Sequence, residues 1–253
     1  MRELALFAGA GGGLLGTRLL GWRPICAVEF NPYRREVLLR RQADGLLELF
    51  PIWDDINTFD GKPWCGKVDV VTGGFPCQPF SPAGKREADQ DARNMWPQTV
   101  RIIREVQPRF CFLENVPGLL SAKTDRHPQG YFGQILRDLA ESGYVCRWDC
   151  ISAAAVGALH QRKRLWILAY SSKVHGLHES KGKISSNCRR HELRRGSSSD
   201  SATKPMGWEV EPKVGRMVDG LANGLESSLE AIGDGQVPAV VVRAWCTLSE
   251  GLV

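Results

Sequence analysis

Residues 4–16 read Leu-Ala-Leu-Phe-Ala-Gly-Ala-Gly-Gly-Gly-Leu-Leu-Gly, an apolar run that passes directly into a cluster of glycines. The run over Leu4–Phe7 predicts a buried strand, and residues Gly12–Leu20 predict a helix that follows it at once. Glycines at such a junction allow a tight turn and let a ligand approach the backbone closely. The pattern GxGxxG occurs at Gly11–Gly16, although a glycine-rich turn alone can be purely structural. The stretch therefore favours an α/β protein whose first turn faces a ligand.

The same alternation of strand-like and helix-like runs continues to residue 170, at the spacing of βαβ units. Further strands are predicted over Ile25–Glu29, Val68–Thr72, Arg109–Leu113, Tyr144–Ile151 and Leu165–Ala169. Helices are predicted from Asn31-Pro32, which is a good N-cap and N1 pair, and over Gln98–Val106 and Phe132–Glu141. We therefore expect an α/β fold with a doubly wound, mostly parallel sheet that is covered by helices on both faces.

The composition changes along the chain and suggests how it is organised. Residues 1–170 carry the alternating pattern and form the first predicted domain. Residues 171–215 are rich in Ser, Gly, Lys and Arg, which predicts a short, basic, poorly ordered insert. Residues 216–253 form a C-terminal segment, in which Val237–Leu248 predicts a helix that packs back onto the sheet.

The distribution of charge singles out the insert. The 253 residues contain 33 basic and 28 acidic side chains, for a formal net charge of +5. Residues 173–195 hold seven basic and two acidic side chains, so this segment alone carries an excess as large as that of the whole chain. Such a cluster indicates either a contact with nucleic acid or a solvated linker, and both interpretations stay open.

Several classes of protein are disfavoured by the sequence. No stretch approaches the roughly 18 consecutive apolar residues of a membrane span. The N-terminus runs straight into a strand pattern, so we expect no signal peptide and an intracellular, cytoplasmic protein without membrane contact. The eight cysteines are scattered without a CxxC pair, and we expect no bound metal.

Acidic residues follow the next two predicted strands. Glu29 lies 20 residues after Gly9 at the end of the second strand, where a carboxylate is placed to accept hydrogen bonds from ribose hydroxyls. Asp54-Asp55-Ile56 comes at the expected end of a third strand, where a carboxylate could accept from an adenine amino group. Each acid alone could be ordinary surface charge. As an ordered set with the glycine-rich turn, they indicate a cofactor that contains adenosine.

Residues 73–82, Gly-Gly-Phe-Pro-Cys-Gln-Pro-Phe-Ser-Pro, place Cys77 after a strand and among prolines that stiffen the loop. Glu114 ends the strand that begins at Arg109, so both residues are expected at one edge of the sheet. A thiolate beside a carboxylic acid suits nucleophilic attack on a polarised ring. Arg162 and Arg164, expected on the same face of the last strand, could clamp an anionic base or a phosphate.

Taken together, these motifs resemble those of the DNA cytosine-5 methyltransferase family. The resemblance covers residues 2–170 and 215–246. The motifs occur in the family's order, as Phe7-Ala-Gly-Ala-Gly-Gly12, Glu29, Asp55-Ile56, Gly74-Phe-Pro-Cys-Gln78, Asp91-Ala-Arg93, Glu114-Asn-Val116, Gln161-Arg-Lys-Arg164 and Gly233-Asp-Gly-Gln-Val-Pro238. The order and spacing of the Pro-Cys-Gln and Glu-Asn-Val motifs are highly specific.

The resemblance implies a Rossmann-like, S-adenosylmethionine-dependent fold and transfer of a methyl group to C5 of cytosine in double-stranded DNA, as in restriction-modification systems of bacteria or phages. It implies a covalent bond from Cys77 to C6 of a flipped-out base, with Glu114 acting at N3 and with Arg162 and Arg164 holding the base and its phosphate. Cofactor contacts are implied for Phe7, Ala8, Gly9, Gly11, Gly12, Glu29, Phe30, Asp55, Ile56, Pro76, Trp96 and Asp234. Substrate contacts are implied for Gln78, Ser81, Lys85, Asn115 and Gln161.

The sequence also departs from the family pattern. Ala5 stands where an acidic residue commonly precedes Leu-Phe, and Asp234 replaces the usual Asn of the last motif. The target-recognition region of the family lies between Gln161 and Arg216, and here it has only about 50 residues. Base-specific readout needs a scaffold that positions side chains in a groove. We therefore expect that the sequence specificity is short, relaxed or supplied by a partner. We also expect the protein to be a monomer.

Two other functions stay open at this point. A tRNA cytosine-5 methyltransferase could be built on the same domain, although that branch typically carries a Cys-Phe-Thr tripeptide, which this sequence lacks. A catalytically silent, prophage-derived protein that only binds nucleic acid is suggested by the short insert and by Asp234.

Overall fold

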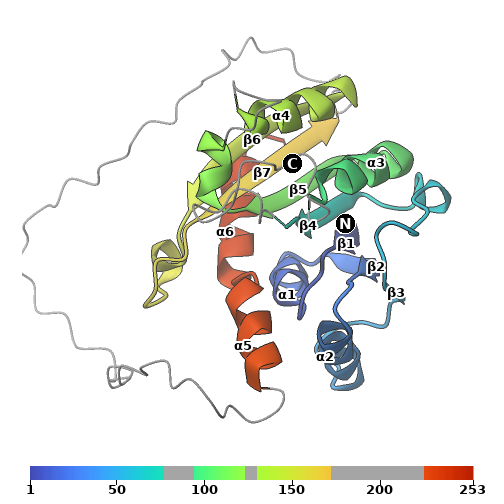
Figure 1. Cartoon of the computed structure of the whole chain (residues 1–253), viewed down its shortest axis with the longest axis vertical. Coiled ribbons are helices and arrows are strands. Elements are labelled where there is room, and N and C mark those ends of the chain that lie inside the picture. The colour runs from blue at the N-terminus through green and yellow to red at the C-terminus, as the bar shows by residue number, and fades with distance from the viewer. Residues whose placement is uncertain (77–93, 123–129, 172–224, 253) are drawn as a thin grey trace, which may run out of the picture.

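The computed structural model describes residues 1–76, 94–122, 130–171 and 225–252. These residues form a sheet of seven strands in the order β3-β2-β1-β4-β5-β7-β6, with helices on both faces (Figure 1). Strands β1 to β5 run parallel to one another, whereas β7 is antiparallel to both of its neighbours, β5 and β6. The predicted α/β class with a doubly wound, mostly parallel sheet is confirmed.

The elements follow the predicted alternation closely. The strands are β1 (Arg2–Leu6), β2 (Arg23–Val28), β3 (Ile52–Trp53), β4 (Val70–Gly74), β5 (Phe110–Asn115), β6 (Tyr144–Ile151) and β7 (Arg164–Ser171). The helices are α1 (Gly12–Leu19), α2 (Pro32–Ala43), α3 (Trp96–Val106), α4 (Tyr131–Glu141), α5 (Leu225–Asp234) and α6 (Pro238–Leu248). Short 3-10 turns cover Lys62–Trp64, Pro117–Ser121 and Ala153–Val156.

Alternating side chains of the strands feed two separate apolar layers. Leu4 and Leu6 of β1 point to the face that α3 and α4 cover. Ala5, between them, packs on the opposite face with Leu14 of α1 and Leu38 of α2. This period of two is what a strand buried on both sides requires. The strand therefore reads as a continuous apolar run, and the sheet is the centre of the molecule.

Helix α6 returns the C-terminal part of the chain to the sheet, as predicted from Val237–Leu248. The ring of Trp245 packs edge-on against Phe112 of β5, with the ring centroids 5.5 Å apart. Phe112 in turn stacks on Trp166 of β7 at 4.9 Å. Helix α6 also lies along α1, so the two ends of the chain share one face of the sheet (Figure 1).

The strand order reverses direction between β1 and β4. From β1 the chain first moves outward to β2 and β3, and later returns to place β4 on the other side of β1. In open α/β sheets a crevice forms at such a switch point, outside the carboxyl ends of the strands. The glycine-rich turn after β1 and the end of β4 both lie at this edge of the sheet.

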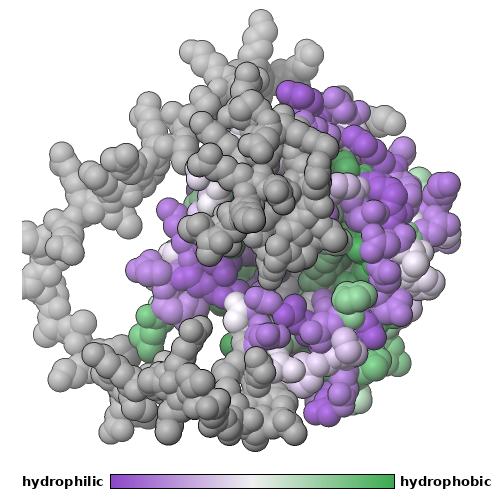
Figure 2. Space-filling model, in the orientation of Figure 1, coloured by the Kyte–Doolittle hydropathy of each residue, from purple (hydrophilic) through white to green (hydrophobic). Residues whose placement is uncertain are grey.

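No helix in the described ranges is both long and apolar enough to cross a membrane. Figure 2 shows hydrophilic residues over most of the described surface on the visible face. The predicted basic insert falls outside the described residues, apart from Ser171, which ends β7. Helix α5, for which no helix was predicted, precedes α6 and ends at Asp234.

Candidate active site

The turn after β1 is held by a buried carboxylate. Phe7, Gly9 and Gly11 have φ angles of 52°, 57° and 85°, so the turn uses the left-handed region that favours glycine. The backbone N–H of Gly9 donates to Oε2 of Glu29 at 2.7 Å, and the N–H of Asn31 donates to Oε1 at 2.9 Å. Only 5% of Glu29 is exposed. The predicted ribose acceptor is therefore fixed in position by the turn itself.

A pocket opens between this turn and the strand ends. It is lined by Ala5, Leu6, Phe7, Ala8, Gly9, Gly13, Leu14, Thr72, Gly73, Gly74, Glu114, Asp234, Gly235 and Gln236. The structure thus brings the predicted cofactor residues of the first turn together with Glu114 and Asp234. More than half of these lining residues are Gly, Ala or Thr, and such small side chains allow a nucleoside cofactor to approach the backbone closely.

Two of the glycines predicted to contact the cofactor are crowded by protein. A Cβ atom built on Gly12 would lie 2.3 Å from the carbonyl oxygen of Gln236, and one built on Gly11 would lie 2.8 Å from Cδ2 of Leu38. The glycine run therefore lets the C-terminal segment and α2 approach the first turn. At Gly9 a Cβ atom would meet nothing within 4 Å, so glycine is favoured at this position by the positive φ angle and not by a lack of space.

Glu114 is the buried acid of the pocket, with 9% of its surface exposed. Nε of Arg164 lies 3.0 Å from its Oε1, and Nε2 of Gln236 lies 3.5 Å from its Oε2. Burial raises the pKa of Glu114, while Arg164 and the amide of Gln236 act in the opposite direction. The site therefore holds a carboxyl group that takes up a proton more readily than an exposed glutamate does.

Arg162 differs from the expectation in its position. Strand β7 begins only at Arg164, and Arg162 has a φ angle of 26° in the segment before it. Its guanidinium donates to the carbonyl oxygens of Gly233 at 2.5 Å and Gly235 at 2.6 Å. Burial lowers the pKa of Arg162. The two arginines are not neighbours on one strand face, although both line a small hollow beside Glu114.

The end of β4 leads toward Cys77 and is anchored to β5. Gly74 is in register with Glu114, and the side-chain amide of Asn115 donates to the carbonyl oxygen of Phe75 at 3.0 Å. Asn115, a predicted substrate contact, is only 3% exposed, so in the structure it fixes the backbone of the loop. Pro76, the last described residue here, is exposed. Cys77, Gln78, Ser81 and Lys85 lie outside the described residues.

Trp96 supports this loop from the far side. It begins α3, is 2% exposed, and its ring packs on Phe75 with the centroids 5.3 Å apart. Its Nε1 donates to Oδ2 of Asp138 at 2.7 Å. Trp96 was predicted to line the cofactor pocket, but it does not belong to the pocket lining and packs against the helices α3 and α4.

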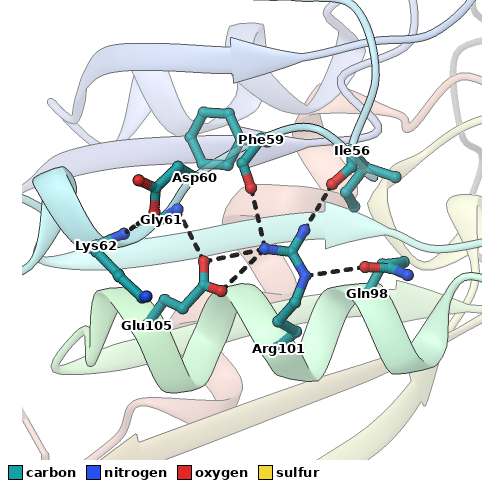
Figure 3. A network of polar contacts seen from close by, with 8 residues as sticks. All are labelled: Ile56, Phe59, Asp60, Gly61, Lys62, Gln98, Arg101 and Glu105. Carbon is teal, nitrogen blue, oxygen red and sulfur yellow. Dashed lines mark hydrogen bonds and ion pairs between the residues drawn. The ribbon is translucent and has the colours of Figure 1, made fainter.

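The loop that carries Asp55 and Ile56 is tied to α3 by a polar network (Figure 3). Arg101 donates to the carbonyl oxygens of Ile56 at 2.7 Å and Phe59 at 3.0 Å, and it pairs with Glu105 at 3.0 Å. Oδ1 of Asp55 accepts from the backbone of Asn57 at 2.8 Å. The sequence analysis did not single out Arg101, because a basic residue on a helix gives no local sign of the loop that it will contact.

The remaining predicted residues are exposed, and of these only Asp234 belongs to the pocket lining. Phe30 is 76% exposed after the end of β2. The side chain of Asp234 is 70% exposed and pairs with Arg34 of α2 at 2.6 Å. Gln161 is exposed, and its carbonyl oxygen accepts from the N–H of Ala153 at 2.8 Å. Within the described ranges, no group of three or more His, Cys, Asp and Glu side chains could hold a metal ion.

The fold and the pocket define an α/β protein of the S-adenosylmethionine-dependent methyltransferase type, with the site at the carboxyl ends of β1, β4 and β5. The profile of the C-5 cytosine-specific DNA methylase family matches residues 1–210. The chain belongs to this family. The predicted family and its methyl donor, S-adenosylmethionine, are thereby confirmed.

Curated relatives and a solved structure to which the chain is similar are also methyltransferases by name. Over 171 residues the chain is 32% identical to the type II methyltransferase M.NgoMIV of Neisseria gonorrhoeae, covering 68% of this chain and 52% of the relative. Over 169 residues it is 31% identical to M.CviJI of Paramecium bursaria Chlorella virus IL3A, covering 66% and 42%. A putative DNA modification methyltransferase from an Escherichia coli prophage superposes with a TM-score of 0.55 at 22% identity, covering 69% and 48%. The chain thus spans about half the length of the relatives it matches.

Proposed function

We propose that this chain transfers a methyl group from S-adenosylmethionine to C5 of cytosine in DNA, through a covalent bond between Cys77 and C6 of a flipped-out base. The observation that carries the proposal is the pairing of Gly74, three residues before Cys77, with the buried acid Glu114. Both border the pocket of the glycine-rich turn. Family membership and two relatives above 30% identity support the DNA substrate.

The residues around the first turn suit the proposed cofactor. Ala8 and Gly9 present backbone at the pocket, and the carboxylate of Glu29 is held beside them. We expect Glu29 to accept from the ribose hydroxyls, and Asp55 with Phe30 to contact the adenine. When bound, S-adenosylmethionine supplies an electrophilic methyl group.

In the proposed reaction, the thiolate of Cys77 adds to C6 of the cytosine, and the C5=C6 electron pair moves to C5. The carboxyl group of Glu114 gives its proton to N3, so negative charge does not build up on the ring. C5 would take the methyl group as the bond between that group and the sulfonium sulfur breaks. C5 then loses its hydrogen as a proton to solvent, the C6–S bond breaks as Cys77 leaves as a thiolate, and N3 returns its proton to Glu114. Burial raises the pKa of Glu114, so its carboxyl group holds that proton more readily than an exposed glutamate does.

Three cysteines of the described fold are poor candidates for the nucleophile. Burial raises the pKa of Cys26 and Cys146 to about 12, and that of Cys111 well above its usual range. Their thiolates are therefore scarce near neutral pH. Cys77 is the cysteine of the only Pro-Cys-Gln motif in the sequence.

We further propose that residues 171–215 serve as a reduced target-recognition region whose basic side chains contact phosphates. This region has only about 50 residues between Gln161 and Arg216, which supports a short or partner-assisted specificity. The affinity for duplex DNA should then fall steeply as the salt concentration rises.

The proposal is tested by incubating the protein with radiolabelled S-adenosylmethionine and either mixed-sequence duplex DNA or tRNA. We expect transfer to DNA, loss of that transfer in Cys77→Ser and Glu114→Gln, and no loss in Cys65→Ser, an exposed cysteine outside the pocket. Modification sequencing of DNA from cells that express the chain reports the target site. Transfer to tRNA alone, or transfer that survives Cys77→Ser, would refute the proposal.

A further inference from the structure

Gln236 occupies a narrow slot whose walls are glycines. A Cβ atom on Gly12 would lie 2.3 Å from its carbonyl oxygen, and one on Gly13 would lie 2.4 Å from its side-chain Oε1. On the opposite wall, a Cβ atom on Gly74 would lie 3.2 Å from its Nε2. Real Cβ atoms do not come as close as the first two distances. The first turn and the end of β4 therefore leave room for this one side chain.

The side chain crosses this slot to reach the buried acid. Nε2 of Gln236 lies 3.5 Å from Oε2 of Glu114, while Nε of Arg164 lies 3.0 Å from Oε1. Each carboxyl oxygen thus has a different donor, one from the C-terminal segment and one from β7. A carboxyl group with a donor at each oxygen has little freedom to rotate, so its remaining lone pairs keep one direction.

The backbone around Gln236 is itself held from outside the slot. Arg162 donates to the carbonyl oxygens of Gly233 and Gly235, directly before Gln236. Behind it, α6 packs on α1, where a Cβ atom at Gly16 would lie 2.6 Å from Cβ of Val241. Because its neighbours on both sides are fixed, Gln236 loses little conformational entropy when its side chain contacts Glu114.

We propose that Gln236 is a positioning residue that orients the carboxyl group of Glu114 toward the base and adjusts its affinity for a proton. The inference rests on the function proposed above, in which Glu114 gives its proton to N3. It also assigns a role to the C-terminal segment, because the docking of this segment brings the amide donor of Gln236 to the carboxyl group of Glu114. An amide donor stabilises the ionised carboxylate, so removal of Gln236 makes Glu114 hold its proton to a higher pH.

The test combines a titration of the free protein with transfer kinetics. In protein labelled with ¹³C at the glutamate carboxyls, the signal of Glu114 is assigned by its loss in Glu114→Gln. We expect Gln236→Met, which keeps the length of the side chain without its donor, to raise the titration midpoint of that signal by about 0.5 to 1 pH unit. The matched control is Ile232→Ala, in the same segment but 75% exposed, and it should leave the midpoint unchanged.

In the kinetic arm, Gln236→Met should lower kcat about tenfold and leave KM for DNA and for S-adenosylmethionine within about twofold. A purely structural role would instead raise KM or lower the thermal midpoint without moving the titration of Glu114. If Gln236→Met does not fold, Gln236→Asn replaces it, since it keeps an amide in the slot but is one methylene too short.

The outcomes separate the two proposals. A shifted midpoint in a protein that transfers no methyl group to DNA would keep the contact and overturn the proposed function. A wild-type enzyme that is active, with the midpoint and kcat of Gln236→Met equal to those of the wild type, would overturn the role of Gln236.

Discussion

Nε of Arg164 lies 3.0 Å from Oε1 of Glu114, so the acid that ends β5 is paired with the residue that begins β7. This meeting depends on the direction of β7. In a parallel strand, the first residue would lie at the opposite edge of the sheet from the site. Because β7 is antiparallel to β5, its N-terminal end reaches the edge where the parallel strands β1, β4 and β5 end. The reversed strand thus supplies the cation of the site.

Arg164→Met should destabilise the protein in a pH-dependent way. The change leaves the carboxylate of Glu114 buried without its cation, which we expect to lower the free energy of unfolding by about 3 kcal/mol at pH 8. At pH 5 the loss should be smaller, because more of Glu114 is protonated. Urea unfolding at both pH values measures it. Arg23→Met, which breaks the exposed pair with Glu48, should cost about 0.5 kcal/mol or less. Equal losses at both pH values for Arg164→Met would show that packing, and not charge, is responsible.

A second buried acid, Glu3, should control how stability varies with pH. It is 1% exposed and accepts from the hydroxyls of Thr17 at 2.5 Å and Thr72 at 2.6 Å. Burial, only partly offset by those hydroxyls, raises its pKa from 4.5 to about 7. Since the folded-state pKa is the higher one, the stabilising contribution is complete below about pH 4.5 and is lost as the pH rises through about 7.

Glu3→Gln removes this titration. Relative to the variant, the wild type should lose up to about 3 kcal/mol of unfolding free energy between pH 4.5 and 8, the equivalent of a shift of about 2.5 pH units. Urea unfolding of both proteins across this range measures the difference. A difference that stays constant with pH would mean that Glu3 does not titrate in this interval.

The elements could be predicted because their signals are local. The runs that became β1, β5 and β7 are apolar over the length of a strand, and Asn31-Pro32 caps α2 as expected, with the Asn31 side chain accepting from the N–H of Arg34. The motif order also pointed to Glu114, which lines the pocket, and to Glu29, which holds the turn beside the pocket. These inferences need only the spacing of residues along the chain.

The contacts that complete the site were not predictable in the same way. Gln236 meets Glu114 across 122 residues, and Arg162 meets Gly235 across 73. Such contacts depend on where α6 docks and on the antiparallel direction of β7, which the apolar pattern of a buried strand does not encode. The crowding of Gly12 was missed for the same reason, since a glycine-rich turn looks alike whether a ligand or another segment approaches it.

Gly16→Ala should test the docking of α6 on α1. A Cβ atom at Gly16 would lie 2.6 Å from Cβ of Val241 and 2.9 Å from the carbonyl oxygen of Pro238, so the helices must separate. We expect the free energy of unfolding to fall by about 1–3 kcal/mol. Gly133→Ala, in the helix α4 with nothing within 4 Å of the new atom, should instead stabilise the protein by about 0.5–1 kcal/mol. Chemical denaturation of both variants gives the comparison, and a neutral Gly16→Ala would contradict the packing.

Arg101→Met should weaken cofactor binding from a distance. Arg101 lies on α3 and holds the loop of Asp55 and Ile56 through two backbone carbonyls (Figure 3). If that loop contacts the adenine as proposed, losing these bonds should raise the Kd for S-adenosylhomocysteine about tenfold, equivalent to about 1.4 kcal/mol. Calorimetric titration measures this Kd without catalysis.

The control for this prediction is Arg104→Met on the same helix, where the guanidinium donates to the hydroxyl of Ser142 and has no hydrogen bond to the loop of Asp55 and Ile56. Its Kd should stay within about twofold of the wild-type value. Both variants remove one positive charge from α3, so a general electrostatic attraction of the cofactor would weaken binding in both alike. A tenfold loss confined to Arg101→Met would mean that binding depends on the carbonyls of Ile56 and Phe59 being held in place, and equal losses would rule that out.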